Sequence, residues 1–301
     1  MKREHIAGVW TVFSLVLSFF LTPPAWAKPI RIGSIHDEPA NEIRKFLPIA
    51  RYLAKELESD GIDAGRVVVA DSIPQMAALL RKGRVDLYID SPFPSLAVSR
   101  FSGSKLLLRR WKKGMSEYHT VFFVRKDSGI SRLEQLKGRM LAFEVPFSTS
   151  GYFLPKMVLI QKGFKLVLKR DASEPVAPDE VGYVFSRDDE NTVVWVLRGK
   201  VSAGALDHRN YLKDAKGSLS QLKRLHETFS IPRHIVSYRA DLPPRLVARI
   251  KDILLGMERS EEGRRVLKAF EKTTKFDEIP EQSLAPLLES PDFFDQEFEL
   301  K

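Results

Sequence analysis

The chain of 301 residues contains no cysteine. Disulfides, thiolate metal sites and cysteine nucleophiles are therefore excluded, and so is a lipid-modified cysteine that would hold the protein on a membrane. A chain of this length can still bury a conventional apolar core and fold without covalent cross-links. We therefore expect a folded protein that is free of a lipid anchor.

Two sequence motifs of hydrolytic enzymes are also absent, the G-x-S-x-G nucleophile turn and the H-E-x-x-H metal motif. The pairs His36-Asp37 and Asp207-His208, together with the serines, leave a hydrolase as a minor alternative. Metal capture by tyrosine and histidine is a second minor alternative. We expect no enzyme activity, no cofactor and no metal.

Long apolar runs are missing after the N-terminal segment. Residues 9–21 are apolar, follow Lys2 and Arg3, and precede Ala25-Trp26-Ala27. A charged start, an apolar centre and an A-x-A end are typical of a secretory signal peptide, and the run is short for a membrane-spanning helix. We expect residues 1–27 to be a signal peptide cleaved after Ala27, with export to the periplasm; an uncleaved anchor is the alternative.

Positive charge is in excess but dispersed: 48 lysines and arginines stand against 39 acidic residues, a formal net charge of +9. A nucleic-acid surface would gather basic residues with aromatic ones, whereas here the aromatic residues lie mostly in apolar runs. The charge pattern indicates a diffuse field that attracts small anions. We expect no nucleic-acid partner and a monomer.

Apolar periodicity alternates between the strand pattern and the helix pattern along most of the chain. This alternation predicts two α/β units of similar size, with a cleft between them. In such sheets ligands bind beyond the carboxyl ends of the strands. The expected strands cover residues 30–35, 66–70, 85–89, 106–111, 121–124, 139–143, 166–168, 181–185, 202–206 and 235–238.

Two local patterns in the first unit make specific predictions. The three consecutive valines at 67–69 predict a strand that is buried on both faces. The spacing Ser72-x-x-Gln75, with a proline inside it, predicts a capped helix start.

Three consecutive hydroxyl residues, Ser148, Thr149 and Ser150, separate the expected strand 139–143 from an apolar helical pattern that follows Gly151. Hydroxyl groups at a helix start can cap its free N–H groups. The same N–H groups and the positive end of the helix dipole also suit an oxyanion. We predict that this turn holds half of an anionic ligand; capping alone is the alternative that the spacing leaves open.

The S-T-S-G-Y turn at residues 148–152 occurs together with Y-H-T-V-F-F-V at 118–124, L-K-G at 136–138 and A-G-A-L-D at 203–207. Taken together in their order along the chain, these stretches resemble the phosphonate/phosphite/phosphate-binding proteins of ABC importers, over roughly residues 30–276. The resemblance implies a periplasmic protein that captures a small oxyanion and delivers it to an ABC permease with its ATPase. A ligand sensor that presents its closed state to a separate receptor is the alternative.

The resemblance further implies a type II periplasmic binding protein fold, with two α/β lobes joined by two crossing hinge strands near residues 120–125 and 235–239. The implied domains are lobe 1 at 28–117 plus 233–275, lobe 2 at 118–232, and a C-terminal extension without chemistry at 276–301.

In the family, the hydroxyl turn donates hydrogen bonds to the oxyanion, and residues of the hinge and of the first lobe face it. An aspartate at the position of Asp207 contacts an amino group or a protonated oxygen of the ligand. The expected ligand-binding residues are Ser148, Thr149, Ser150, Tyr118, His119, Asp207, Ser91, Asp37 and Arg187.

Four residues depart from the pattern of many family members: Glu144, Phe147, Asp90 and Arg187. A buried Glu144 or Asp90 would add negative charge, and Arg187 would supply a bidentate grip on an oxyanion. Exposure to solvent or a structural ion pair is the alternative for each of the three charged residues. The identity of the oxyanion therefore stays open.

Overall fold

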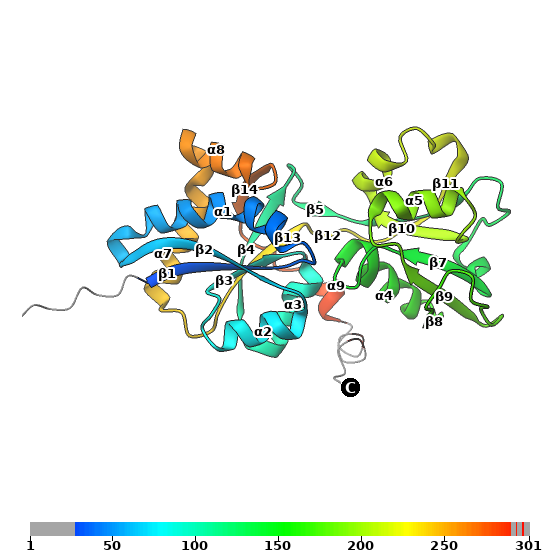
Figure 1. Ribbon diagram of the computed structural model, residues 1–301, viewed down its shortest axis with the longest axis horizontal. Helices are drawn as coiled ribbons and strands as arrows, with labels where there is room; N and C mark the ends of the chain where they lie inside the picture. The colour runs from blue at the N-terminus through cyan, green and yellow to red at the C-terminus, as the bar shows by residue number, and fades with distance from the viewer. Residues whose placement is uncertain (1–27, 290–292, 294–296, 298–301) are drawn as a thin grey trace, which may run out of the picture.

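The computed structural model describes residues 28–289, 293 and 297, so the predicted signal peptide and its cleavage site after Ala27 lie outside the described residues. Two α/β bodies lie side by side, each a sheet with helices on both faces (Figure 1). We call them lobe 1 and lobe 2. Among the described residues, no helix combines the length and the apolar character needed to cross a bilayer.

Lobe 1 is built on a six-stranded sheet. Its strands are β1 (Lys28–Ile35), β2 (Ile62–Ala70), β3 (Leu87–Asp90), β4 (Lys105–Lys112), β13 (His234–Tyr238) and β14 (Thr273–Asp277), and its helices are α1 (Pro39–Glu56), α2 (Ile73–Arg81), α3 (Pro92–Ser102), α7 (Pro244–Gly256) and α8 (Glu261–Ala269). The strand order is β14-β4-β13-β3-β1-β2. The pairs β1–β2 and β1–β3 are parallel, as the alternation of strand and helix predicts, while β13 runs antiparallel to β3 and β4.

Lobe 2 repeats this layout with a second six-stranded sheet. Its strands are β6 (Thr120–Arg125), β7 (Arg139–Phe143), β8 (Lys165–Leu168), β9 (Glu180–Phe185), β10 (Ala203–Asp207) and β11 (Leu222–Glu227), and its helices are α4 (Leu154–Gln161), α5 (Asp189–Leu197) and α6 (His208–Asp214). The order is β11-β6-β10-β7-β9-β8. The central strand β7 is parallel to both of its neighbours, β10 and β9. The next strand, β6, pairs with β10 and is antiparallel to it.

Two short strands connect the lobes. β5 (Glu117–Tyr118) and β12 (Ile231–Pro232) form an antiparallel ladder of their own, located between the two sheets (Figure 1). The predicted crossing segments, 120–125 and 235–239, instead form β6 and most of β13 inside the sheets, so each crossing lies a few residues earlier in the chain. The strands of lobe 1 fall within residues 28–112 and 234–277, so this sheet reaches past the proposed boundary at 275.

The two local predictions for lobe 1 have different outcomes. Ser72 Oγ accepts a hydrogen bond from Gln75 N at 3.4 Å, which confirms the capped start of α2. The valines at 67–69 are only half-buried, so the prediction of a fully buried strand is wrong. The reason is that β2 is the outermost strand of its sheet, where one side has no neighbouring strand.

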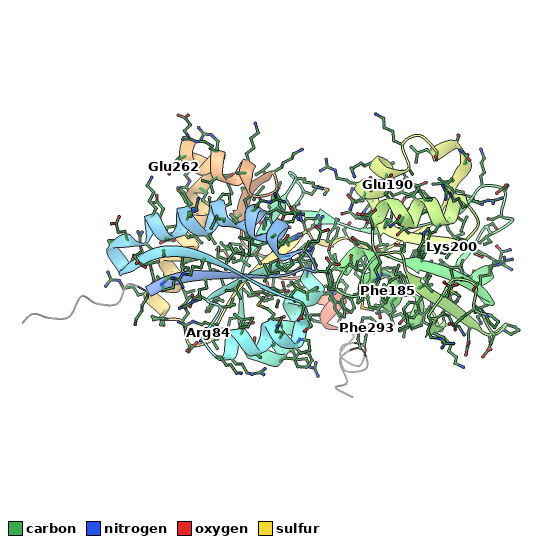
Figure 2. The ribbon with its side chains drawn as sticks, in the orientation of Figure 1. Arg84, Phe185, Glu190, Lys200, Glu262 and Phe293 are labelled. Carbon is green, nitrogen blue, oxygen red and sulfur yellow. The ribbon has the colours of Figure 1, made fainter. Side chains whose placement is uncertain are left out.

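An apolar contact also joins the lobes. Phe93 of α3 stacks on Phe153 of lobe 2, with ring centroids 4.0 Å apart and planes at 9°, and both side chains belong to one buried cluster. Phe293 packs edge-on against Phe93 and lies where the lobes meet (Figure 2). The described part of the C-terminal segment is therefore packed against both lobes, and Glu297 accepts hydrogen bonds from Tyr152 and Lys156 of lobe 2.

Candidate functional site

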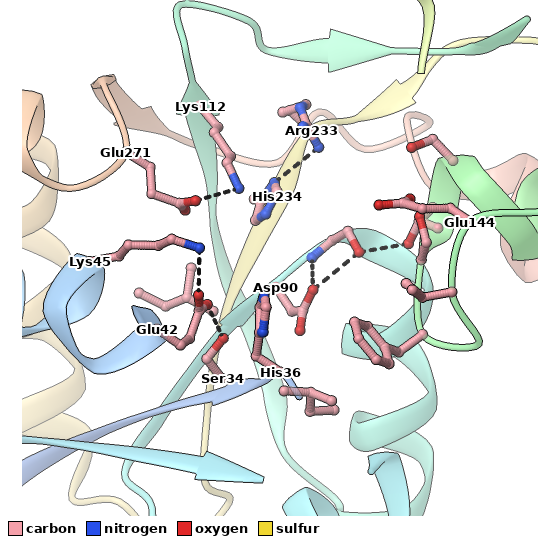
Figure 3. A pocket seen from close by; sticks show the side chains of 18 of the residues that line it. Ser34, His36, Glu42, Lys45, Asp90, Lys112, Glu144, Arg233, His234 and Glu271 are labelled. Atoms are coloured by element: carbon pink, nitrogen blue, oxygen red, sulfur yellow. Dashed lines mark hydrogen bonds and ion pairs between the residues drawn. The ribbon is translucent and has the colours of Figure 1, made fainter. Parts of the chain in front are cut away.

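A cavity of about 260 Å³ lies between the lobes. It opens at the carboxyl ends of β1 and β3 of lobe 1 and of β7 of lobe 2, beside the crossing strands (Figure 3). This is the edge at which parallel sheets bind ligands, and the volume lies at the small end of the range for ligand sites. Five expected site residues line it: Ser91, Tyr118, Ser148, Thr149 and Ser150.

The hydroxyl turn leads from β7 into α4 through a single π-helical turn, Thr149–Phe153. Ser148 Oγ accepts a hydrogen bond from Gly151 N at 3.0 Å, so the predicted cap exists. Thr149 Oγ1 donates to Ser91 Oγ at 2.8 Å and accepts from Phe93 N at 3.1 Å, which ties lobe 2 to the start of α3. The hydroxyls of Ser148 and Thr149 therefore have protein partners already.

Asp90 and Ser91 form the lobe 1 side of this contact. The Asp90 carboxylate accepts hydrogen bonds from Ser91 N at 2.6 Å and from Tyr88 Oη at 2.9 Å. Burial raises the pKa of Asp90 to about 6, against the lowering effect of these donors. Asp90 therefore stabilises the backbone at the start of α3, and it also lines the cavity.

A buried basic cluster borders the cavity at the crossing and at the end of β4. We define it as Arg110, Lys112, Arg233 and His234, with Glu271 as its carboxylate (Figure 3 shows all but Arg110). Lys112 Nζ lies 2.8 Å and Arg110 Nη2 lies 3.0 Å from Glu271. Burial lowers the pKa of Lys112 to about 8, and neighbouring cations contribute to the shift.

Within the cluster His234 is uncharged at neutral pH, because burial and the charges of Lys112, Arg233 and Arg110 hold its pKa well below 6.5. Arg233 is 8% exposed, and its guanidinium lies 4.3 Å from the ring centroid of Tyr118. Its Nη2 is 3.5 Å from Asp207, and its Nε has no hydrogen-bond partner among the described residues. Tyr118 Oη, buried near the hydroxyls of Thr149 and Ser150, likewise makes no hydrogen bond of good geometry there.

The predicted site did not include this basic cluster. The sequence holds one signal that points to it, since Lys112 ends β4 and Arg233 directly follows β12, and strand ends are where ligands bind.

The lobe 2 wall also carries carboxyl groups, Glu144 and Asp189. Burial is the main cause that raises the pKa of Glu144, while the Ser148 hydroxyl and Arg233 act against it. Burial, followed by the charge of Glu144, raises the pKa of Asp189 to about 8. Asp189 accepts a hydrogen bond from Asn210 Nδ2 at 2.6 Å. The surroundings of both carboxyls therefore make their ionisation less favourable than in water.

Two expected site residues stand just behind the wall of the cavity. Asp207 is 3% exposed and caps α6, accepting from Arg209 N at 2.7 Å, while its second oxygen faces Arg233. His119 stacks on His208 with centroids 4.3 Å apart, and its Nε2 lies 3.3 Å from Glu227. Neither residue lines the cavity.

Asp37 and Arg187 are also outside the lining of the cavity. The Asp37 side chain is exposed and lies 3.1 Å from His36 Nδ1. Arg187 adopts a left-handed backbone with φ of 75°, and its N donates to Glu144 O at 2.9 Å. Such a backbone is uncommon outside glycine, so Arg187 marks a tight turn after β9 beside the site.

Similar structures share this architecture. The chain is similar to XAC2383 from Xanthomonas citri bound to chloride ion, with 28% identity and a TM-score of 0.83 over 90% of this chain and 98% of that one. It is also similar to XAC2383 bound to ATP, with 26% identity, a TM-score of 0.83 and the same coverage. PhnD1 from Prochlorococcus marinus in complex with methylphosphonate shares 20% identity and has a TM-score of 0.61, over 91% of this chain and 99% of that one, which shows the fold.

A family model described as "ABC transporter, phosphonate, periplasmic substrate-binding protein" matches residues 32–284. The family confirms the type II periplasmic binding fold and a solute-binding role, with a small ligand, a transporter as partner and the periplasm as location. Its members are substrate-binding proteins rather than enzymes. The chain therefore belongs to the family of periplasmic substrate-binding proteins of phosphonate ABC transporters.

Proposed function

We propose that this protein captures a small phosphorus oxyanion, of the phosphonate, phosphite or phosphate class, and delivers it to an ABC permease with its ATPase. The observation that carries the proposal is the convergence of three kinds of donor on one cavity between the lobes. These are the hydroxyl turn, the Tyr118 hydroxyl and the Arg233 guanidinium. Family membership supports the transporter as the partner.

The donors suit an oxyanion for physical reasons. The hydroxyl turn stands at the start of a helical segment, where free N–H groups and the helix dipole favour negative charge. Tyr118 Oη and Arg233 Nε are buried and lack hydrogen bonds of good geometry, and an oxyanion would supply acceptors for both. Charge-assisted hydrogen bonds of this kind are about twice as strong as neutral ones.

We assign different parts to the expected site residues. Tyr118 and Ser150, together with backbone N–H groups of the turn, contact the oxyanion in this proposal. Ser91 and Thr149 hold the lobes together through their hydrogen bond of 2.8 Å. Asp207 positions the Arg233 guanidinium, from which it lies 3.5 Å.

The remaining three, His119, Asp37 and Arg187, lie outside the cavity lining, and we assign them positions around the site rather than ligand contacts. We further propose that the protein acts as a monomer, since one chain carries both walls of the cavity.

A thermal-unfolding assay on residues 28–301 tests the proposal with methylphosphonate, phosphite, phosphate and sulfate. A ligand at a hundred times its dissociation constant adds roughly 2.7 kcal/mol of stability. We expect a clear increase in Tm with at least one phosphorus oxyanion, and a smaller increase in Ser150→Ala.

ATP belongs in the same panel, because the related Xanthomonas citri protein is described as bound to ATP. An increase in Tm with ATP and none with the small oxyanions would indicate that the ligand is a nucleotide. No shift with any compound would contradict the proposed function.

A further inference from the structure

The basic cluster lacks one negative charge. Arg110, Lys112 and Arg233 are three cations, whereas two carboxylates lie within ion-pair distance of them among the described residues: Glu271 at Arg110 and Lys112, and Asp207 at Arg233. Burial, and after it the charges of Arg233 and Arg110, lower the pKa of both His234 and Lys112. Buried charges of one sign without a counter-charge are costly.

The hydrogen bonds of the cluster are incomplete as well. Arg110 Nη1 and Arg233 Nε are buried without a hydrogen-bond partner among the described residues. Arg233 contacts Asp207 only at 3.5 Å, which is longer than a good charge-assisted hydrogen bond. Of the residues of the cluster that carry a positive charge, Arg233 and Lys112 line the cavity, and Arg110 does not.

The cluster and the hydroxyl turn stand on different sides of the cavity. In Figure 3, Lys112 extends into the cavity from the end of β4, while Glu144 marks the opposite wall that bears the hydroxyl turn. One water takes up about 30 Å³ in the liquid, so the cavity of about 260 Å³ has room for several groups of that size. Lys45, also on the lobe 1 side, shares the carboxylate of Glu42 with no other cation among the described residues, whereas Lys112 shares Glu271 with Arg110.

We propose that Lys112 and Arg233 form a second anion subsite, so that the preferred ligand is a phosphorus oxyanion that carries a further acidic group. The phosphorus oxyanion lies at the hydroxyl turn and Tyr118, and the further acidic group lies against Lys112, with the Arg233 guanidinium shared between the two. This inference rests on the proposed function and names the ligand class more narrowly.

Isothermal titration of the chain 28–301 with methylphosphonate and phosphonoacetate tests the subsite, because the two differ by one carboxylate. One added charge-assisted hydrogen bond corresponds to about tenfold or more in affinity. We expect phosphonoacetate to bind at least about tenfold tighter than methylphosphonate.

Lys112→Met is the matched variant. It removes the charge of Lys112, while Glu271 stays paired with Arg110 at 3.0 Å. It should remove most of the preference for phosphonoacetate and leave methylphosphonate affinity nearly unchanged. Arg233→Lys keeps the charge but loses the guanidinium fork, and it should reduce the preference in part. Lys82→Met, at an exposed position after α2, is the control for loss of one positive charge and should keep the full preference.

The outcomes separate the two proposals. Equal affinity for both compounds in the wild type overturns the second subsite and leaves the proposed function standing. A preference that survives in Lys112→Met overturns the location of the subsite. Absence of binding for both compounds overturns the second subsite, while the thermal-unfolding panel with phosphite and phosphate decides the proposed function separately.

Discussion

The two walls of the cavity differ in how far their polar groups are satisfied. On the lobe 2 wall, Ser148 caps its own turn and Thr149 is bonded to Ser91 across the cleft. On the wall formed by the crossing and by β4, the guanidinium of Arg233 and the hydroxyl of Tyr118 are buried and incompletely hydrogen bonded. The comparison indicates that the first wall provides structure as well as donors, while the second depends more on a ligand.

This difference changes how the hydroxyl motif is understood. Its first two members contribute to the closed arrangement of the lobes, so substitutions there combine stability and binding. The basic wall should respond to substitution mainly through charge.

The largest effect is expected at Arg110, the buried charge behind the basic wall. Its side chain is 0% exposed, donates to Thr273 Oγ1 at 2.9 Å and pairs with Glu271. Glu271 keeps Lys112 as a partner at 2.8 Å in a variant without Arg110. However, two buried acceptors, Thr273 Oγ1 and Phe270 O, lose a donor, which costs about 1–3 kcal/mol for each. Arg110→Met should lower the free energy of unfolding in urea by the sum of these two costs.

Arg84→Met is the control for Arg110→Met, because Arg84 is exposed on the outer part of lobe 1 (Figure 2). Its free energy of unfolding should stay within about 0.5 kcal/mol of the wild type. Equal stability of Arg110→Met and the wild type would show that the cluster contributes no structure.

The second prediction concerns Asp90, whose pKa is raised to about 6 by burial from an ordinary value of 3.8. The folded state then holds a proton that the unfolded state releases, so the contribution of Asp90 to stability is full below pH 3.8 and is lost as the pH rises through about 6. Asp90→Asn has no carboxyl group to ionise, so the variant does not lose this stability as the pH rises. The variant should be more stable than the wild type by about 3 kcal/mol at pH 7.5.

The gain of Asp90→Asn should shrink as the pH falls from 7.5 towards 4, which urea unfolding at several pH values measures. A gain that is independent of pH would assign the effect to hydrogen bonding instead. A variant less stable than the wild type at every pH would contradict the raised pKa.

The smallest effects are expected at the hydroxyl turn. Thr149→Val removes the hydrogen bonds of Thr149 Oγ1 with Ser91 Oγ and Phe93 N, while Ser91 Oγ still donates to Asp90 Oδ1 at 3.1 Å. The loss should cost about 1–2 kcal/mol in the free energy of unfolding without ligand. Ser148→Ala removes the cap and should cost about 1 kcal/mol.

Thr274→Val, at an exposed threonine of β14, is the matched control and should leave stability unchanged. If Thr149→Val were also neutral, the contact between Ser91 and Thr149 would make no contribution to joining the lobes, and the contrast between the walls would fail on the lobe 2 side.

Much of the fold follows from the sequence because apolar periodicity and turn residues are local signals. The strand before Ser148, the capped start at Ser72 and the strand ends that meet at the cleft are all of this kind. The partly accessible β2 is different, because its place at the edge of the sheet depends on the order of strands and not on its own valines.

The missed parts of the site depend on contacts that are distant in sequence. Thr149 meets Ser91 across 58 positions, and Arg110 meets Glu271 across 161. A buried arginine such as Arg110 also has no local signature, because charged residues usually lie at the surface. The partner of Asp207 was not predictable for the same reason, since Arg233 reaches it from beyond the second crossing strand.

The most direct test of the account is a crystal structure of the chain 28–301 grown with methylphosphonate. The account predicts the phosphonate group in the cavity between the lobes, within hydrogen-bond distance of Ser150 and Tyr118 and in contact with Arg233. A phosphonate bound elsewhere, or a cavity in which Tyr118 and Arg233 make no contact with the ligand, would contradict it.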